Sequence, residues 1–393
     1  MKFIPSPEVF EYINSQLNED IQKLALKKNP FPEMDWKWIL NQIAAKKKAK
    51  DKLPTWYKTN AIIYPSTLSI EQTSSELLAA HKSQLINGKK VIDLTGGFGI
   101  DAYYFAKSFK EVTHCEWNEE LSNIVQYNSE KLDVKNMNFF QGNSIEYLQN
   151  TSDVYDLIYI DPARRDEHTN KVFRFEDCEP NVVEHLDLLL EKSTQLLIKS
   201  SPLVDIHLGI QQLKFVSKIW VVAYKNEVKE LLWLVSKKCN LNPTIEAVNI
   251  EKDKTYSFEN ILVEDDVVQF SHPKTYLYEP FSSLLKTGLF NAIGNTYHLS
   301  KLHPHSHLYT SDEKIDFPGR VFDIVNIYPF QKAEIKKYIQ NQKMNVTIRN
   351  FPLSVDQLRK KYKIKEGGDI YAFFTTNIEH EKIIIITKKI EKF

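Results

Sequence analysis

The chain has 393 residues, more than the roughly 250–300 at which a single hydrophobic core stops growing, so we expect more than one domain. Its composition, 42% hydrophobic and 26% charged, is that of an ordinary soluble globular protein, and 51 basic residues balance 51 acidic ones. The balance excludes a basic field over the whole molecule, so any nucleic-acid surface must be a local patch. We find no apolar signal segment and no apolar run of about 20 residues, and therefore expect a cytoplasmic protein without a membrane span.

Residues 1–75 have the pattern of a helical region that is partly basic. Apolar residues recur at helical spacing over 36–43. The lysine-rich run 46–52 follows, with Trp56 and Tyr57 close behind. Two interpretations stay open: the run is a solvated helix face, or it contacts phosphates with the help of the aromatic residues. In 69–76, Ser and Thr precede an acid, which predicts a capping box at the start of the next helix.

From residue 76 to about 265, apolar strands alternate with helices. The pattern predicts an α/β fold with a parallel sheet covered by helices on both faces. The expected strands are 90–94, 111–116, 139–141, 157–160, 195–199 and 219–223, with a last pair between about 244 and 264. The expected helices are 119–132, 144–148, 182–192 and 227–236. Ligands of such sheets bind outside the carboxyl ends of the strands, so the chemistry is expected there.

The composition changes beyond this sheet. Residues 272–320 contain Pro-, His- and Gly-rich turns. Residues 321–393 return to regular structure and predict a small α+β domain. Its expected strands are 321–328, 345–349, 370–375 and 382–387, and its expected helices are 333–341 and 354–361. This last region holds 14 basic against 8 acidic residues, a local excess that suits a phosphate backbone.

The most informative segment is 91–101, Val-Ile-Asp-Leu-Thr-Gly-Gly-Phe-Gly-Ile-Asp, which predicts a buried strand, a glycine loop and a helix. Gly96, Gly97 and Gly99 would let the backbone approach a ligand closely. Asp93 ends the strand, and Glu116 ends the next one, where an acid is the usual partner of ribose hydroxyls. These residues indicate a nucleotide-like cofactor.

Two cofactors fit the glycine loop. Residues 97–102 match the G-x-G-x-x-A dinucleotide fingerprint, with Glu116 about 20 residues further on. S-adenosylmethionine instead carries positive sulfonium and ammonium groups, which favour the nearby acids Asp93 and Asp101, and Asn143 would contact its adenine edge. A tight turn without a ligand is the third interpretation.

The loop 161–165, Asp-Pro-Ala-Arg-Arg, favours the second cofactor. In a methyltransferase this loop faces the methyl group, so Asp161 could accept a hydrogen bond from an amino or ring N–H while Pro162 stiffens the turn. Arg164 and Arg165 are candidates for holding phosphate or pairing with acids of the cofactor site. We expect one of the two arginines to form a structural ion pair.

These motifs resemble the class I S-adenosylmethionine-dependent methyltransferases that end in a THUMP-like domain. The resemblance rests on residues 68–76, 93–101, 161–165 with 172–175 behind them, 276–280, 302–304 and 317–320. After the helical region 1–75, it implies a Rossmann-like methyltransferase domain (76–265), a ferredoxin-like segment (272–320) and a THUMP-like domain (321–393). It also implies methylation of RNA, either tRNA or rRNA.

For this family we expect Asp161, Pro162 and Arg164 in catalysis and Arg165, Phe173 and Lys199 in substrate binding. One departure leaves the target atom open. Enzymes that methylate exocyclic amino groups commonly carry a second Pro and an aromatic residue where this chain has Ala163 and Arg164. The stacking face could instead come from Phe173, Phe175, Tyr159 or the Arg164 guanidinium.

Other chemistries find weaker support in the sequence. Cys178 is the only plausible cysteine nucleophile, and we expect it to be structural or incidental, with Cys115 buried in a strand. His303, His305 and His307 share a strand face but lack a fourth ligand, so we expect no metal site.

The sequence therefore predicts direct transfer of a methyl group to a base nitrogen of RNA, without metal or covalent adduct. The alternatives are an NAD(P)-dependent oxidoreductase and a non-catalytic RNA-binding protein on a methyltransferase fold.

Overall fold

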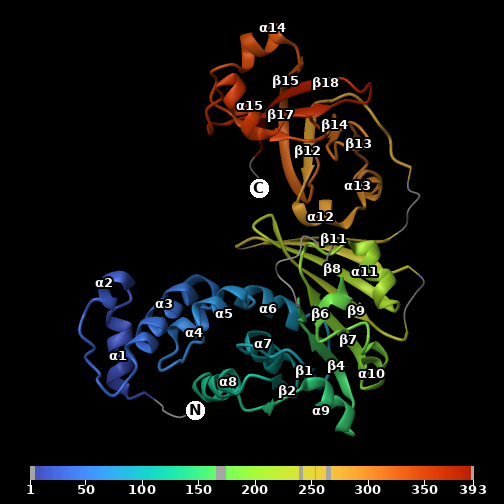
Figure 1. Ribbon diagram of the computed structural model, residues 1–393. Coiled ribbons are helices and arrows are strands. Elements are labelled where there is room, and N and C mark those ends of the chain that lie inside the picture. Colours follow the sequence, from blue (N-terminus) through green and yellow to red (C-terminus); the bar gives the residue numbers. More distant parts are fainter. Residues whose placement is uncertain (1–4, 165–173, 239–241, 253, 263–266, 391–393) are drawn as a thin grey trace. The chain divides into compact units, whose positions relative to one another are not determined.

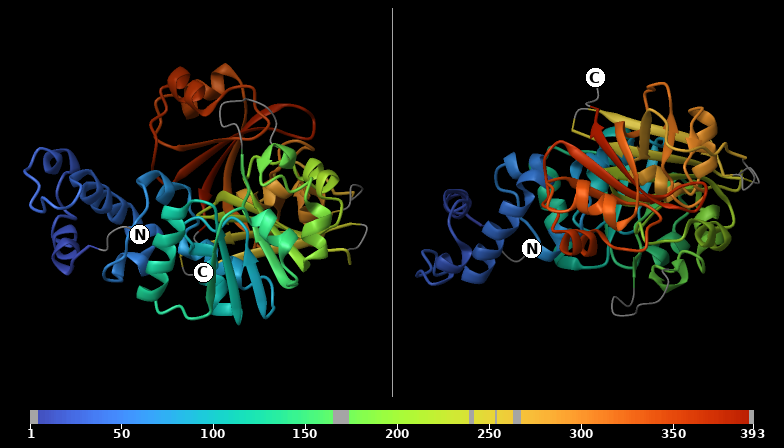
Figure 2. Two further views of the ribbon diagram at one scale, coloured as in Figure 1. Left: turned by 60° about the horizontal axis from the view of Figure 1, so that its bottom comes forward. Right: turned by 90° about the horizontal axis from the view of Figure 1, so that it is seen from above.

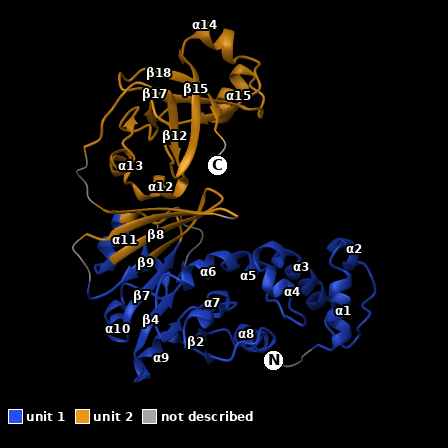
Figure 3. Ribbon diagram, turned by 180° about the vertical axis from the view of Figure 1, so that it is seen from behind, with its two compact units in different colours: residues 1–200, 207–216, 233–239 blue, residues 201–206, 217–232, 240–393 orange. Residues whose placement is uncertain are grey.

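The computed structural model describes residues 5–164, 174–238, 242–252, 254–262 and 267–390 (Figure 1). The chain divides into two compact units (Figure 3). The first consists of residues 1–200, 207–216 and 233–239, and the second of residues 201–206, 217–232 and 240–393. Within the described residues, no helix has both the length and the apolar character needed to cross a membrane.

The N-terminal region of the first unit is helical, as expected. Its helices are α1 (Pro7–Ser15), α2 (Ile21–Ala25), α3 (Trp36–Lys52), α4 (Pro54–Lys58), α5 (Thr67–Gln72) and α6 (Glu76–Ser83). Much of the lysine run 46–52 is engaged locally: Lys46 is buried, Lys48 forms an ion pair with Glu71, and Lys52 donates to the Glu71 carbonyl oxygen at 2.6 Å. These contacts favour the interpretation of the run as a helix face over the interpretation that it contacts phosphates.

The expected capping box before α6 is wrong. Ser75 alone caps this helix, accepting from the backbone N–H of Leu78. The Glu76 carboxylate turns away from the helix start and accepts hydrogen bonds from the Thr55 hydroxyl (2.6 Å) and the Tyr104 hydroxyl (2.8 Å). This acid therefore ties α4 to the helix after the glycine loop, a contact that local sequence cannot reveal.

Five parallel strands form the centre of the first unit. They are β1 (Lys90–Asp93), β2 (Glu111–Glu116), β3 (Met137–Gln141), β4 (Tyr155–Ile160) and β7 (Ser193–Ser200), in the order β7-β4-β1-β2-β3. Helices lie on both faces of these strands (Figure 2): α7 (Ile100–Ser108), α8 (Glu119–Lys131), α9 (Ser144–Asn150), α10 (Leu186–Glu191) and α11 (Ile206–Leu213). The α/β fold is thus confirmed. The strand order reverses at β1, the position where ligands bind in open parallel sheets.

One predicted element has the wrong type. Residues 227–236 were expected to be a helix, but β9 (Glu227–Val235) is a strand that follows β8 (Val216–Tyr224) through a two-residue turn. Lys225 and Asn226 both have positive φ angles, 51° and 61°, as in a type I′ hairpin turn. The apolar run after the turn is compatible with a buried helix or a buried strand, and the turn decides between them.

In the second unit, β10 (Thr244–Ile250) pairs in parallel with β8 and antiparallel with β11 (Thr255–Ile261). A separate seven-stranded sheet has the order β13-β14-β12-β15-β18-β17-β16. Its strands are β12 (Tyr276–Pro280), β13 (Ser300–Lys301), β14 (Tyr309–Ser311), β15 (Gly319–Pro329), β16 (Asn345–Ile348), β17 (Ile370–Thr376) and β18 (Lys382–Lys389). Its helical segments are α12 (Ser282–Thr287), α13 (Phe290–Thr296), α14 (Lys332–Glu334), the π-helical turn 335–339 and α15 (Val355–Tyr362). The regions expected as ferredoxin-like and THUMP-like therefore share one sheet.

Candidate active site

The glycine loop joins the end of β1 to α7 and is fixed by backbone hydrogen bonds on both sides. Leu94 N–H donates to the Tyr159 carbonyl oxygen of β4 at 3.0 Å, and Gly96 N–H donates to the Cys115 carbonyl oxygen of β2 at 2.8 Å. Gly97 N–H donates to Oε2 of Glu116 at 2.9 Å. The loop is therefore held between the carboxyl ends of the two strands that flank β1.

The three glycines of the loop are required for different reasons. A Cβ on Gly96 would lie 2.3 Å from Nε2 of His114, and one on Gly99 would lie 2.6 Å from the side chain of Val125. Packing excludes side chains there. Gly97 has a φ of 53°, and a Cβ would meet nothing closer than a backbone oxygen at 3.8 Å. Only at Gly97 does the backbone face open space that a ligand could occupy.

Thr95 connects two of the predicted site acids, and its role was missed from sequence. Its N–H donates to Oδ1 of the buried Asp93 at 3.0 Å, and its hydroxyl oxygen accepts from the backbone N–H of Asp161 at 2.7 Å. Thr95 thereby links Asp93, at the end of β1, to Asp161, which directly follows β4.

Asp101, in the first turn of α7, is surrounded by partners. Oδ2 accepts from the Ser74 hydroxyl at 2.9 Å and the Tyr159 hydroxyl at 3.0 Å, and Oδ1 lies 3.3 Å from Nζ of the fully buried Lys82. Burial opposes ionisation of this carboxyl, but Lys82, Lys199 and the two hydroxyls outweigh it, so the pKa of Asp101 lies below its ordinary value. Asp101 is therefore a charged carboxylate in a fixed position.

The Glu116 carboxylate, at the end of β2, orders the turn beside it. Oε2 accepts from Gly97 N–H at 2.9 Å and Oε1 from Asn118 N–H at 2.8 Å. Burial raises its pKa despite these donors. A carboxylate has about four lone-pair positions, so this residue keeps acceptor capacity for the hydroxyl groups of a ribose.

Negative charge is crowded around β1. The pKa of Asp93 is raised well above its ordinary value because the carboxyl is buried and because Asp101, Asp161 and Glu116 lie nearby. The same environment, burial first and then Asp93 and Glu116, raises the pKa of the Cys115 thiol, which excludes a thiolate there at neutral pH. A cation placed beside Asp93 would relieve this repulsion.

Asp161 follows β4 directly, as predicted, and its carboxylate forms an ion pair with Nζ of Lys199 on β7. Lys199 was predicted as a substrate-binding residue, yet the structure directs its ammonium group to this carboxylate. The two strands are neighbours in the sheet, which is why residues 38 apart in sequence meet. Lys199 thus holds Asp161 while a carboxylate oxygen remains for a further donor.

The rest of the acidic loop is described only in part. Pro162 is buried, and Arg164 is half-buried in the short strand β5 (Ala163–Arg164), which pairs with β6 (Cys178–Glu179). Arg165 and Phe173 lie outside the described residues. The two other proposed stacking faces are unsuitable because both rings are buried: Phe175 packs edge-on against Trp233, and Tyr159 is bonded to Asp101.

Asn143 occupies the N-cap of α9. Its Oδ1 accepts from Ile145 N–H at 2.9 Å and from Glu146 N–H at 3.3 Å. The side chain is exposed, and its oxygen already satisfies two donors at the helix start. A contact to adenine would therefore have to come from the amide nitrogen, which now bonds to the Glu146 carboxylate, so this role stays a prediction.

The remaining candidates have structural partners. Cys178 is buried, with its sulfur 3.6 Å from the Arg174 carbonyl oxygen. His303 contacts the His380 ring and the Asn350 amide, each at 3.1 Å, while the His307 ring stacks on Phe290. Across the part of the chain that the structure describes, His, Cys, Asp and Glu do not gather in any group of three or more suited to a metal ion.

The glycine loop after β1, the acid closing β2 and the acid–proline turn after β4 together define a class I methyltransferase fold. Family models match residues 276–318 as a ferredoxin-like domain and residues 319–389 as a THUMP domain-like region. The solved structure of a candidate methyltransferase from Porphyromonas gingivalis W83 is 32% identical to the chain, covers 98% of both chains and has a TM-score of 0.89. The chain belongs to the family of that protein, the class I methyltransferases with C-terminal ferredoxin-like and THUMP-like domains.

A more distant relative matches part of the chain. Over 135 residues, 33% of the chain, the sequence is 28% identical to an uncharacterized RNA methyltransferase of Mycoplasma mobile. The match spans 37% of the length of that relative.

Proposed function

We propose that the protein is an S-adenosylmethionine-dependent methyltransferase that modifies a base nitrogen of RNA, either tRNA or rRNA. The observation that carries the cofactor assignment is the crowding of Asp93, Asp101, Glu116 and Asp161 around the glycine loop, next to the open backbone at Gly97. S-adenosylmethionine has a sulfonium and an ammonium group, and these positive charges would neutralise the excess of carboxylates.

The same charges disfavour a dinucleotide. A pyrophosphate needs free N–H donors at the start of the helix after the glycine loop. Here Gly97 N–H is bonded to Glu116, and the first turn of α7 contains the ionised Asp101. A doubly charged anion would be repelled by these carboxylates, so the NAD(P) alternative has no support in the arrangement.

Each residue then has a defined task. Asp93 would receive the ammonium group of the donor and Glu116 its ribose hydroxyls, with Gly97 providing close access. Once bound, S-adenosylmethionine supplies an electrophilic methyl group. Asp161, oriented by Lys199 and through its backbone by Thr95, would accept a hydrogen bond from the N–H of the target base and align the nitrogen lone pair.

RNA is proposed as the acceptor because three independent features agree. The last 73 residues have 14 basic against 8 acidic side chains. The THUMP domain-like match covers this same region, and the partial relative from Mycoplasma mobile is described as an RNA methyltransferase. The nitrogen as target follows from the lack of a suitable cysteine nucleophile among the described residues of the site.

The first test is a thermal-shift titration with S-adenosylmethionine, S-adenosylhomocysteine and NAD(P)H in parallel. A ligand at about 100 times its dissociation constant stabilises a protein by roughly 2.7 kcal/mol, which gives a clear shift. We expect stabilisation by the two adenosyl ligands only. Transfer of labelled methyl groups to RNA from a strain that lacks this gene then tests the acceptor. Stabilisation by NAD(P)H, or binding of RNA without transfer, would support the alternatives.

A further inference from the structure

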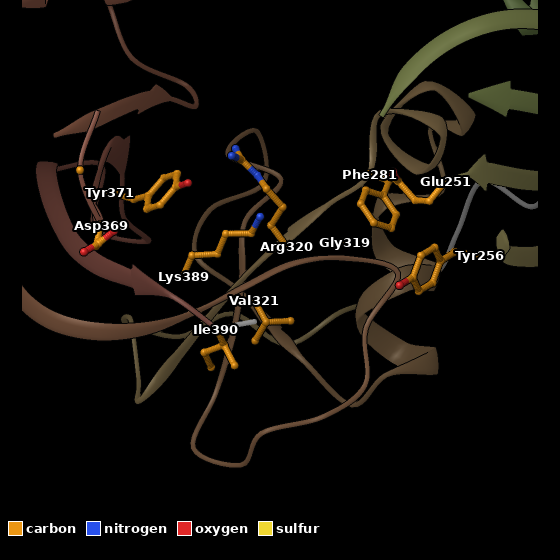
Figure 4. Close-up of a pocket in the computed structure, with 11 residues that line it drawn as sticks. Glu251, Tyr256, Phe281, Gly319, Arg320, Val321, Asp369, Tyr371, Lys389 and Ile390 are labelled. Carbon is orange, nitrogen blue, oxygen red and sulfur yellow. The ribbon is translucent and has the colours of Figure 1, made fainter. Parts of the chain in front are cut away.

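A pocket of about 810 Å³ lies entirely within the second unit (Figure 4). Three segments contribute to it: the hairpin β10–β11, the start of α12, and the neighbouring ends of β15, β17 and β18. The lining residues are Glu251, Tyr256, Phe281, Gly319, Arg320, Val321, Gly368, Asp369, Tyr371, Lys389 and Ile390. Its volume falls in the range of about 300–1,000 Å³ typical of sites for small ligands. We call it the junction pocket.

Two motifs singled out from sequence, 276–280 and 317–320, meet beside this pocket. Glu279 of the first is opposite Arg320 of the second in the pairing of β12 with β15. The buried Glu279 carboxylate accepts from Nε of Arg320 at 2.6 Å, and its other oxygen accepts from Arg349 at 2.7 Å. Arg320 is therefore held in one orientation by a buried acid that it shares with a second arginine.

The cations of the junction pocket lie among aromatic rings. In Figure 4 the Arg320 and Lys389 side chains lie between Tyr371 on one side and Tyr256 with Phe281 on the other. The Arg320 guanidinium is 5.9 Å from the Tyr371 ring centroid. Tyr256 is supported from behind by the Phe281 ring, with centroids 5.3 Å apart. The pocket thus presents aromatic faces on two walls and positive charge between them.

The charged and aromatic side chains that line the junction pocket indicate which class of ligand it can bind. A simple anion would meet the carboxylates of Glu251 and Asp369 as well as the two cations, and an apolar molecule would face four charged side chains. A nucleotide has complementary parts for all of them: a π face for a tyrosine ring, a phosphate for Arg320 and Lys389, and N–H and hydroxyl donors for the acids.

We propose that the junction pocket binds one unpaired nucleotide of the RNA acceptor, with its base stacked on Tyr371 or Tyr256 and its phosphate on Arg320 and Lys389. The inference rests on the proposed function for the identity of the acceptor as RNA. Glu279 is then a positioning residue, because it orients Arg320 without reaching the ligand.

The test measures binding of a fluorescein-labelled single-stranded RNA oligonucleotide by anisotropy, using matched variants. Lys389→Gln removes a positive charge from the pocket. Lys388→Gln makes the same change at the neighbouring residue of β18, which does not line the pocket. We expect Lys389→Gln to weaken binding severalfold and to reduce the slope of log affinity against log salt by about 0.7, the value for one phosphate contact on a single strand. Lys388→Gln should leave the slope nearly unchanged.

A second pair separates ligand contact from folding. Arg320→Met and Arg349→Met each take one guanidinium from Glu279, but only Arg320 lines the pocket. We expect similar melting temperatures for the two variants and weaker RNA binding for Arg320→Met. Tyr371→Leu should lower affinity at least about fivefold if a base stacks on the ring.

The outcomes distinguish this inference from the proposed function. If RNA binds and methyl transfer occurs, but the pocket variants bind RNA as tightly as their controls, then the proposed nucleotide site is wrong and the proposed function stands. If the adenosyl ligands do not bind, the methyltransferase assignment fails, and the pocket is still judged by the oligonucleotide. A wild-type protein that binds no single-stranded RNA overturns the pocket.

Discussion

The backbone N–H of Asp161 donates a 2.7 Å hydrogen bond to the hydroxyl of Thr95, which is 66 residues earlier in the chain. The backbone N–H of Thr95 also donates to the Asp93 carboxylate, so this one residue connects the end of β1 to the residue that follows β4. If Asp93 binds the cofactor and Asp161 the acceptor, as proposed, this contact would fix the spacing between the two reactants.

Replacing Thr95 by valine keeps its shape and removes this hydrogen bond. We expect kcat for methyl transfer to fall by up to roughly 100-fold, because a small displacement of Asp161 misaligns the reacting groups, while the affinity for S-adenosylhomocysteine changes little. Thr95→Ser, which retains the hydroxyl, should keep most of the activity. Single-turnover kinetics and calorimetric titration measure the two effects. Equal activities of the valine and serine variants would contradict this role.

The loop glycines provide a matched pair. Gly96→Ala places a methyl group against the His114 ring and should destabilise the fold, whereas Gly97→Ala has space and meets only the strain of a positive φ, roughly 1–3 kcal/mol. We expect Gly96→Ala to lower the melting temperature more than Gly97→Ala does. Relative to its loss of stability, Gly97→Ala should lower the affinity for the cofactor more. Unchanged affinity in Gly97→Ala would mean that the open side of the loop does not face the cofactor.

Lys199 is expected to act through Asp161. Lys199→Met should lower kcat by roughly 10–100-fold because the Asp161 carboxylate loses the partner that orients it, whereas KM for the RNA should change little. Lys199→Arg restores the charge and should recover part of the rate. Steady-state kinetics over a range of RNA concentrations separates the two parameters. A rise in KM alone would instead support the original expectation that Lys199 contacts the substrate.

Most of the fold was predictable because its signals are local. The alternation of apolar strands with helices predicted the five parallel strands, and the glycine loop marked the turn from β1 into α7. The strand β9 was mistaken for a helix because its apolar run has no clear period of 2 or 3.6 residues. The better signal was the Lys225–Asn226 pair, since asparagine tolerates the positive φ that a type I′ turn requires.

The site was predictable at the strand ends and less so elsewhere. Asp93, Glu116 and Asp161 could be placed because each closes an expected strand. The partners of the site carboxylates could not be predicted, since Lys82 of α6 and Ser74 just before that helix reach Asp101, and Lys199 reaches Asp161 from a neighbouring strand. The motif 68–76 also did not show how its residues are used: Ser74 donates to Asp101 in the first turn of α7, whereas Glu76 accepts from the Tyr104 hydroxyl in the packing between helices.

The raised pKa of Asp93 predicts a pH dependence with a definite sign. The native protein holds this proton to a higher pH than the unfolded chain, whose aspartates titrate near 3.9. Between these two pKa values the native state binds more protons, so the free energy of unfolding falls as pH rises, by up to about 1.4 kcal/mol per pH unit. Asp93→Asn keeps the acceptor for Thr95 N–H and cannot ionise, so it should lack this contribution and be more stable than wild type at neutral pH.

The same variant should bind the cofactor less well, because an amide cannot neutralise the ammonium group. In the wild type, binding is expected to release the Asp93 proton, which calorimetry in buffers of different ionisation enthalpy detects as a buffer-dependent heat. Urea unfolding of both proteins between pH 4 and 7, together with these titrations, checks the argument. If the free energy of unfolding changed with pH in the same way in both proteins, or if Asp93→Asn still released a proton on binding the cofactor, a group other than Asp93 would be responsible.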